Sequence, residues 1–209
     1  MAKLELPPIY PITASSALTG TDHVAQARAF LSAGLCFFQV REKQMDDRTF
    51  CALLLQIRQL CDQASAQFII NDRIDLALAS GADGVHLGQT DLPVDIARRL
   101  LGKDAIIGIS THNRNQFLQA QEMDVDYVAV GPIYRTGTKE SPYPPLNHQF
   151  IQEVVELKRH PLVAIGGISL ETAPRVWEAG ADSVALISDI VAAPNPGQRI
   201  SEYLRLSRR

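Results

Sequence analysis

The sequence lacks long hydrophobic runs and contains three cysteines without Cys-x-x-Cys spacing. No apolar stretch approaches the ~18 residues that a membrane span requires. Lys3 and Glu5 interrupt the region where a signal peptide would carry its apolar segment. Cys36, Cys51 and Cys61 lie in apolar stretches, which predicts buried, reduced thiols rather than a disulfide framework. We therefore expect a cytoplasmic protein.

An excess of charge of one sign is also absent. The chain has 20 Lys and Arg against 23 Asp and Glu, so its formal net charge is -3. Proteins that bind nucleic acids or membrane surfaces usually carry a basic excess, so we expect neither kind of partner. The composition leaves open whether copies of the chain form a homo-oligomer.

Short apolar runs are what the sequence does contain, and they recur with helical patterns between them. Each run is too short for a helix and rich in Val, Ile and Phe. The runs cover residues 9–12, 37–40, 68–70, 84–87, 105–109, 127–130, 162–165 and 183–187. Amphipathic stretches cover 23–33, 48–63, 94–101, 115–122, 150–158 and 171–178.

Apolar strands that alternate with helices indicate a parallel sheet covered by helices. Eight such units favour closure, so residues 1–209 are predicted to form a single α/β domain, a (β/α)8 TIM barrel. The length of 209 residues is close to the lower limit for this fold, which requires short loops. The sequences Gly81-Ala82-Asp83-Gly84-Val85 and Gly180-Ala181-Asp182-Ser183-Val184 are a weak internal repeat.

Polar residues at the carboxyl ends of the strands are the candidates for function, because active sites of such barrels lie there. After the second run, Gln39, Arg41 and Lys43 share one face of an extended chain, and Val40 and Glu42 share the other. Two cations and an amide suit a phosphate or pyrophosphate. The alternative is a solvated strand end.

Two acids follow the third and fourth runs. Neighbouring parallel strands lie ~4.8 Å apart, so Asp72 and Asp91 could converge on one point. Carboxylates in contact require a proton or cation between them, and Mg²⁺ suits two carboxylates beside phosphate oxygens. The alternative is that each acid caps a helix, as Asp91 before Leu92-Pro93 suggests.

Later strand ends offer a second anion site. Ser110 could bind a substrate or begin a helix. The segment 131–145 is long enough to indicate a functional loop and contains Thr136, Thr138 and Lys139, although it could be a polar surface loop. Gly166-Gly167 follows the seventh strand, where barrels often bind phosphate through backbone N–H groups; the alternative is a tight turn.

The five histidines give weaker signals. His86 is expected to be a hydrogen-bonded wall residue, and His112 could carry a proton or be structural. His23, His148 and His160 have no partner that the sequence identifies.

Taken in order, these motifs resemble the thiamine-phosphate synthase family over nearly the whole chain. The matching segments are Gln39-Val40-Arg41-Glu42-Lys43, Asn71-Asp72-Arg73, His86-Leu87-Gly88-Gln89-Thr90-Asp91, Gly108-Ile109-Ser110-Thr111-His112, Gly131-Pro132 with Thr136-Gly137-Thr138-Lys139, Ala164-Ile165-Gly166-Gly167-Ile168, and Ile187-Ser188. One departure is Ala14, where family members often have an acid after the first strand.

The resemblance implies a TIM-barrel transferase that joins hydroxymethylpyrimidine pyrophosphate to a thiazole phosphate by dissociative loss of pyrophosphate. It implies Mg²⁺ held by Asp72 and Asp91, and catalysis by Arg41, Lys43, Lys139 and Ser110. Implied pyrimidine-pyrophosphate contacts are Gln39, Arg41, Lys43, Asn71, Ser110 and Lys139; implied thiazole-phosphate contacts are Thr136, Thr138, Gly167, Ile187 and Ser188. Val40, Glu42 and Gly137 are further implied substrate contacts.

Two other interpretations remain. A thiazole tautomerase would keep the phosphate site but lose the paired acids and the cations, which this sequence retains. A non-catalytic barrel that binds a phosphorylated ligand is the second, since a fold alone does not determine activity.

Overall fold

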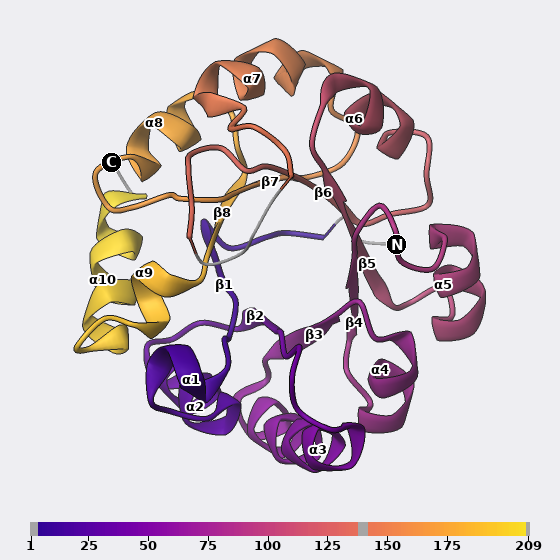
Figure 1. Cartoon of the computed structure of the whole chain (residues 1–209), viewed down its shortest axis with the longest axis vertical. Coiled ribbons are helices and arrows are strands. Elements are labelled where there is room, and N and C mark those ends of the chain that lie inside the picture. Colours follow the sequence, from indigo (N-terminus) through magenta and orange to yellow (C-terminus); the bar gives the residue numbers. More distant parts are fainter. Residues whose placement is uncertain (1–3, 138–141, 208–209) are drawn as a thin grey trace.

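The apolar runs form parallel strands that follow one another around a barrel (Figure 1). The computed structural model describes residues 4–137 and 142–207, and in these it contains an eight-stranded sheet. Strand β1 pairs with β8, and the bridge between Ile12 and Gln39 joins β1 to β2. The strands are β1 Ile9–Pro11, β2 Phe37–Val40, β3 Gln67–Asn71, β4 Gly84–Leu87, β5 Ile106–Thr111, β6 Tyr127–Val130, β7 Leu162–Ile165 and β8 Ser183–Leu186. The predicted TIM barrel is confirmed.

Helices surround the strands as an outer layer (Figure 1). They are α1 Ser16–Thr19, α2 His23–Ser32, α3 Asp47–Ala64, α4 Ile74–Ser80, α5 Val94–Leu101, α6 Arg114–Ala120, α7 Asn147–Val154 with the 3-10 turn η1 Val155–Leu157, α8 Ala173–Glu178, α9 Ser188–Val191 and α10 Pro196–Leu206. Asp22, Asp46 and Asn113 begin α2, α3 and α6 by accepting backbone N–H bonds. Helix α10 was not predicted, although Asn195 caps it and Pro196 opens it.

Side chains alternate between the barrel interior and the layer beneath the helices. Tyr10, Phe37 and Tyr127 belong to the smaller interior cluster, whereas Val40 belongs to the larger cluster between strands and helices. Gly108 makes room for Tyr127, because a Cβ at Gly108 would lie 2.0 Å from Cζ of that ring. Apolar and aromatic side chains thus fill the barrel interior, and polar side chains gather near the carboxyl ends of the strands.

A repeated acid clamp holds the amino-terminal ends of the strands. Each of three aspartates precedes one strand and accepts a hydrogen bond from the first or second residue of the preceding strand, and each also pairs with a cation. The clamps are Asp83 with Phe68 N (2.9 Å) and Arg58, Asp126 with Ile107 N (2.8 Å) and Arg98, and Asp182 with Leu162 N (2.7 Å) and Lys158. The weak sequence repeat is therefore a structural device, and Asp126 is a third copy that the sequence pattern did not reveal.

The cysteines differ in their exposure. Cys61 is buried, and burial raises the pKa of its thiol to about 12. Cys51 is partly buried and Cys36 is exposed, so the prediction of three buried thiols is wrong for Cys36, which lies just before β2 where the chain comes to the surface. Among the described residues, no helix is both long and apolar enough to cross a membrane.

Candidate active site

Two adjoining cavities lie at the carboxyl ends of the strands. The deeper one, of about 400 Å³, is lined by Gln39, Arg41, Asn71, His86 and Ser110 among others. The wider one, of about 710 Å³, is lined by Thr136, Gly166, Gly167, Ile187 and Ser188 among others. Ser110, Ile165 and Ile187 line both, so the cavities meet above β5 and β7. Each volume is within the range of small-molecule sites.

The end of β2 supplies an amide and a guanidinium to the deeper cavity. Gln39 is almost fully buried, and Arg41 lines the wall beside it. The buried Nε of Arg41 has no hydrogen-bond partner among the residues that the structure describes. A buried donor that lacks a partner is costly, so this guanidinium is suited to an anionic ligand.

Val40 and Glu42 face away from these cavities, as strand alternation requires. Val40 is fully buried in the outer cluster, and the Glu42 carboxylate binds His23 of α2. Both side chains therefore point toward the helix layer, so contact of Val40 and Glu42 with substrate stays a prediction that only their backbone atoms could fulfil.

A buried chain of hydrogen bonds crosses the top of the barrel interior. Gln39 Nε2 donates to the Tyr10 hydroxyl (2.9 Å), which lies 2.9 Å from the Tyr127 hydroxyl. His86 Nδ1 lies 2.8 Å from the Tyr127 hydroxyl, and its Nε2 lies 2.8 Å from Oγ of Ser110. We call Gln39, Tyr10, Tyr127, His86 and Ser110 the interior relay. It confirms the expectation that His86 is a hydrogen-bonded wall residue.

One order of donors gives each hydrogen bond of the relay a donor and an acceptor. Burial raises the pKa of both Tyr10 and Tyr127, so both phenols keep their protons. In that order Gln39 donates to Tyr10, Tyr10 to Tyr127, Tyr127 to Nδ1 of His86, and the Nε2–H of His86 to Ser110. This order keeps the Ser110 proton and the Gln39 carbonyl oxygen for a ligand.

The two acids meet beside this cavity. Asp72 follows β3 in a left-handed conformation (φ 65°), and its N–H donates to the His86 carbonyl (2.9 Å). Asp91 accepts a hydrogen bond from Gly88 N (2.6 Å), and its carboxyl group lies near that of Asp72. Burial, followed by the contact with Asp72, raises the pKa of Asp91. Lys43 Nζ pairs with Asp72, so the sequence-predicted cation joins the acids.

Neither acid is a helix cap. Helix α5 begins at Val94 with Pro93 in the N-cap position, while the Asp91 carboxylate turns back to Gly88. Arg73, not Asp72, is the N-cap residue of α4. The capping alternative is therefore wrong for both residues, because the Asp91 carboxylate binds Gly88 N and the Asp72 carboxylate pairs with Lys43.

The donor set fits a divalent ion that shares its ligands with a phosphate. The described residues hold no cluster of three or more His, Cys, Asp or Glu side chains that could bind a metal by themselves. Asp72 and Asp91 supply two carboxylates in contact. Mg²⁺ commonly binds one or two carboxylates and completes its shell with water and substrate phosphates.

The wider cavity is shaped by the loop after β6, which lies on the end of β7. Tyr134 N donates to the Gly166 carbonyl (2.9 Å). Gly167 has φ 62°, and a Cβ there would lie 2.4 Å from the Arg135 carbonyl oxygen, so only glycine fits. Thr136 lines this cavity and Gly137 is exposed beside it. Thr138 and Lys139 lie outside the described residues.

Comparison with known proteins agrees with this geometry. The model of the family described as thiamine monophosphate synthase matches residues 9–190. The chain belongs to the thiamine monophosphate synthase family. It is 47% identical over 173 residues to the thiamine-phosphate synthase of Chlorobium phaeovibrioides, covering 83% of each chain. It is 41% identical over 194 residues to that of Lawsonia intracellularis, covering 93% of this chain and 89% of the relative.

A solved member of the family has the same fold. The thiamine phosphate pyrophosphorylase from Pyrococcus furiosus matches with a TM-score of 0.86 at 30% identity, covering 96% of this chain and 95% of that one. The protein is thus an enzyme of the transferase class, built on a TIM barrel. At Ala14, where family members often carry an acid, the backbone is fixed by the Gln26 amide, through bonds of 3.0 Å to its N–H and 2.8 Å to its carbonyl.

Several residues near the site escaped the sequence analysis. Tyr10 and Tyr127 lie within apolar runs of the sequence and were therefore interpreted as core residues of strands, although their hydroxyls form the middle of the interior relay. Asp189 lines the wider cavity, but its carboxylate is bound by Arg199 (3.0 Å) and by the Tyr203 hydroxyl (2.6 Å). His112, for which the sequence left a proton carrier and a structural role open, donates its Nδ1–H to Gly131 O (2.6 Å) and stacks on Tyr143, with ring centroids 4.0 Å apart.

Proposed function

We propose that this transferase joins an aminopyrimidine that carries a methylene pyrophosphate to a thiazole phosphate, giving thiamine phosphate and pyrophosphate. The observation that carries the assignment of sites is the cluster at the ends of β2, β3 and β4. There Lys43 pairs with Asp72, which lies near Asp91. Arg41, whose Nε lacks a partner among the described residues, lines the deeper cavity together with Asn71, the residue before Asp72. Cations next to paired acids suit a metal-bound pyrophosphate.

The interior relay matches the polar edge of an aminopyrimidine. Such a ring offers an exocyclic amino donor next to a ring nitrogen acceptor. The Gln39 carbonyl oxygen accepts from the amino group, and the Ser110 hydroxyl donates to the ring nitrogen, which agrees with the donor order given above. Asn71, which also lines the deeper cavity, adds a polar contact.

The reaction requires the bond between the methylene carbon and the pyrophosphate oxygen to break. Its electron pair leaves with the pyrophosphate, where Arg41 and Lys43 stabilise the growing negative charge in a site whose dipoles are already oriented. Asp72 and Asp91 would hold Mg²⁺, which when bound supplies further positive charge to the leaving group. Lys139, outside the described residues, is proposed from the family resemblance to act on the same anion.

The thiazole phosphate occupies the wider cavity. Its phosphate binds near Thr136, Gly167, Ile187 and Ser188, and its ring nitrogen then faces the methylene carbon where the cavities meet. Gly137, and Thr138 outside the described residues, are proposed from the family resemblance to contact the same substrate. The nitrogen lone pair forms the new C–N bond as the pyrimidine cation is quenched. The apolar walls of Ile165 and Ile187 keep water from competing for that cation.

A direct assay tests this function. The protein is incubated with both substrates and Mg²⁺, and thiamine phosphate and pyrophosphate are measured together. Equal amounts of the two products are expected. Isomerisation of the thiazole alone would identify a tautomerase, and binding without turnover would identify a ligand-binding barrel; either result contradicts the proposal.

A further inference from the structure

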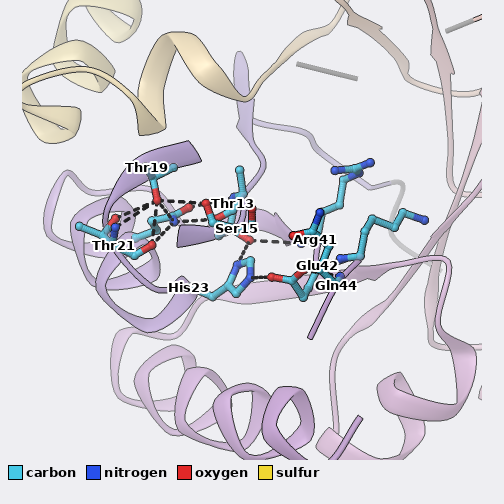
Figure 2. Close-up of polar contacts among 11 residues, drawn as sticks. Thr13, Ser15, Thr19, Thr21, His23, Arg41, Glu42 and Gln44 are labelled. Atoms are coloured by element: carbon cyan, nitrogen blue, oxygen red, sulfur yellow. Dashed lines mark hydrogen bonds and ion pairs between the residues drawn. The ribbon is translucent and has the colours of Figure 1, made fainter. Parts of the chain in front are cut away.

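A second buried network lies directly behind the cationic end of β2. It joins Thr13 after β1, His23 at the start of α2 and Glu42 in the segment after β2 (Figure 2). The side chain of His23 is 1% exposed and that of Glu42 is 4% exposed. An acid and an imidazole so fully removed from water are expensive unless each polar atom has a partner. Neither residue lines the cavities described above.

The contacts of this network end on the backbone of the two cationic residues. His23 Nε2 lies 2.9 Å from Glu42 Oε2, and His23 Nδ1 lies 2.7 Å from Thr13 Oγ1. The Thr13 hydroxyl accepts a hydrogen bond from Arg41 N (3.2 Å). The other oxygen of Glu42 accepts bonds from Lys43 N (2.6 Å) and Gln44 N (2.7 Å).

A neutral histidine satisfies every member of this arrangement. Arg41 N–H donates to the Thr13 oxygen, the Thr13 hydroxyl donates to Nδ1 of His23, and Nε2–H of His23 donates to Glu42. Burial alone would raise the pKa of Glu42, but the hydrogen bonds from His23, Gln44 N and Lys43 N outweigh it and lower that pKa. Glu42 is therefore an ionised, fully bonded anchor.

We propose that His23, Glu42 and Thr13 are positioning residues that fix the Arg41–Lys43 segment, and so set the affinity of the enzyme for the departing pyrophosphate. The segment follows β2 and is neither helix nor strand, so the backbone hydrogen bonds of regular secondary structure do not hold it. The network fixes the backbone on either side of Glu42, while the Arg41 side chain extends away from His23 (Figure 2). The inference rests on the proposed function for the identity of the anion.

The test measures binding rather than turnover, so it can fail separately from the proposed function. Pyrophosphate with Mg²⁺, and the thiazole phosphate alone, are titrated calorimetrically into the wild-type protein and two variants. His23→Phe keeps a planar ring beside Phe50 (ring centroids 5.8 Å apart) but removes both hydrogen bonds. Thr13→Val keeps the side-chain shape but removes the hydroxyl.

Both variants should bind pyrophosphate at least about 10-fold more weakly, which corresponds to about 1.4 kcal/mol, because a misplaced hydrogen bond to a charged group loses about this much. Their affinity for the thiazole phosphate should change less than about twofold. Thr13→Ser, which keeps the hydroxyl, should restore pyrophosphate binding. Unchanged pyrophosphate affinity in Thr13→Val would overturn the proposal.

A control variant separates positioning from general destabilisation. Asp83→Asn weakens an acid clamp at the opposite end of the barrel, through the Arg58 pair and Phe68 N. It should lower the melting temperature without selective loss of pyrophosphate. If Asp83→Asn and His23→Phe weakened both ligands equally, the network would be structural only, which also overturns the proposal. Failure of the wild-type protein to form thiamine phosphate would contradict the proposed function instead.

Discussion

The carboxyl groups of Asp72 and Asp91 lie near each other at the ends of the neighbouring strands β3 and β4, and Asp72 contributes to the raised pKa of Asp91. Lys43 pairs with Asp72, and Asp91 is tied to Gly88 N at 2.6 Å. Two acids in contact repel each other once both are ionised, unless a cation is present. The site is therefore prepared to bind positive charge, and this has consequences for stability as well as for turnover.

Asp91→Asn should stabilise the metal-free protein at neutral pH. Burial and the contact with Asp72 raise the pKa of Asp91, so the folded protein holds that proton more tightly than the unfolded chain. The corresponding stability is complete below the unfolded pKa and is lost as pH rises through the folded pKa. An amide keeps the bond from Gly88 and avoids the charge.

The measurement is thermal unfolding of both proteins at several pH values. At pH 7 the variant should melt about 1–4 °C higher, which corresponds to up to about 1 kcal/mol in a domain of this size. The difference should shrink in acid, and Mg²⁺ with pyrophosphate should raise the wild-type melting temperature more than that of the variant. A lower melting temperature for Asp91→Asn at pH 7 would contradict the account.

Loss of either acid should impair turnover. Asp72→Asn or Asp91→Asn should lower kcat by about 10²- to 10³-fold, because a bound metal contributes several kcal/mol to stabilisation of charge in the transition state. The remaining activity should depend less on Mg²⁺ concentration. Steady-state rates across a magnesium titration provide the check, and wild-type behaviour of both variants would remove the metal from the account.

Tyr127→Phe should weaken binding of the pyrimidine substrate. Removal of this hydroxyl breaks the interior relay between Tyr10 and His86. The Tyr10 hydroxyl and His86 Nδ1 each lose a hydrogen-bond partner, which costs about 1–3 kcal/mol of folding free energy. The KM for the pyrimidine substrate should rise. Tyr203→Phe is the matched control, since it removes a buried hydroxyl bonded to Asp189 in the outer layer. An equal rise in that KM for both variants would argue against the relay.

Gly167→Ala should weaken binding of the thiazole phosphate. The residue has φ 62°, and its new Cβ would meet the Arg135 carbonyl at 2.4 Å, which displaces the loop that shapes the wider cavity. Gly81→Ala is the control, because Gly81 has a similar φ of 68° but its Cβ would only touch Arg58 at 3.9 Å. Both variants should lose about 1 kcal/mol of stability. Only Gly167→Ala should raise the KM for the thiazole phosphate; equal KM values would contradict this role.

Local patterns in the sequence predicted most of the fold. Apolar runs of three to five residues marked every strand, and strand alternation separated Gln39 and Arg41 from Val40 and Glu42. Acids at successive strand ends predicted the contact between Asp72 and Asp91, because register in a parallel sheet brings such positions together. Helix α10 was missed although its Asn-Pro start was present.

Partners that are distant in sequence could not be predicted in the same way. Tyr10 and Tyr127 are separated by 117 positions, and His23 and Glu42 by 19. No periodicity links such pairs, because their contact depends on how the strands close and how α2 packs on the barrel. The sequence therefore indicated the groups that face the ligands, but not the buried groups that orient them.

The central claim is that the departing pyrophosphate lies between the acid pair and the cations of β2. A crystal structure with Mg²⁺ and pyrophosphate tests it most directly. The account predicts a metal ion bound by Asp72 and Asp91, with pyrophosphate oxygens in contact with Arg41 and Lys43. Pyrophosphate bound instead beside Gly167 and Ser188, with the two acids still in contact and without metal, would contradict it.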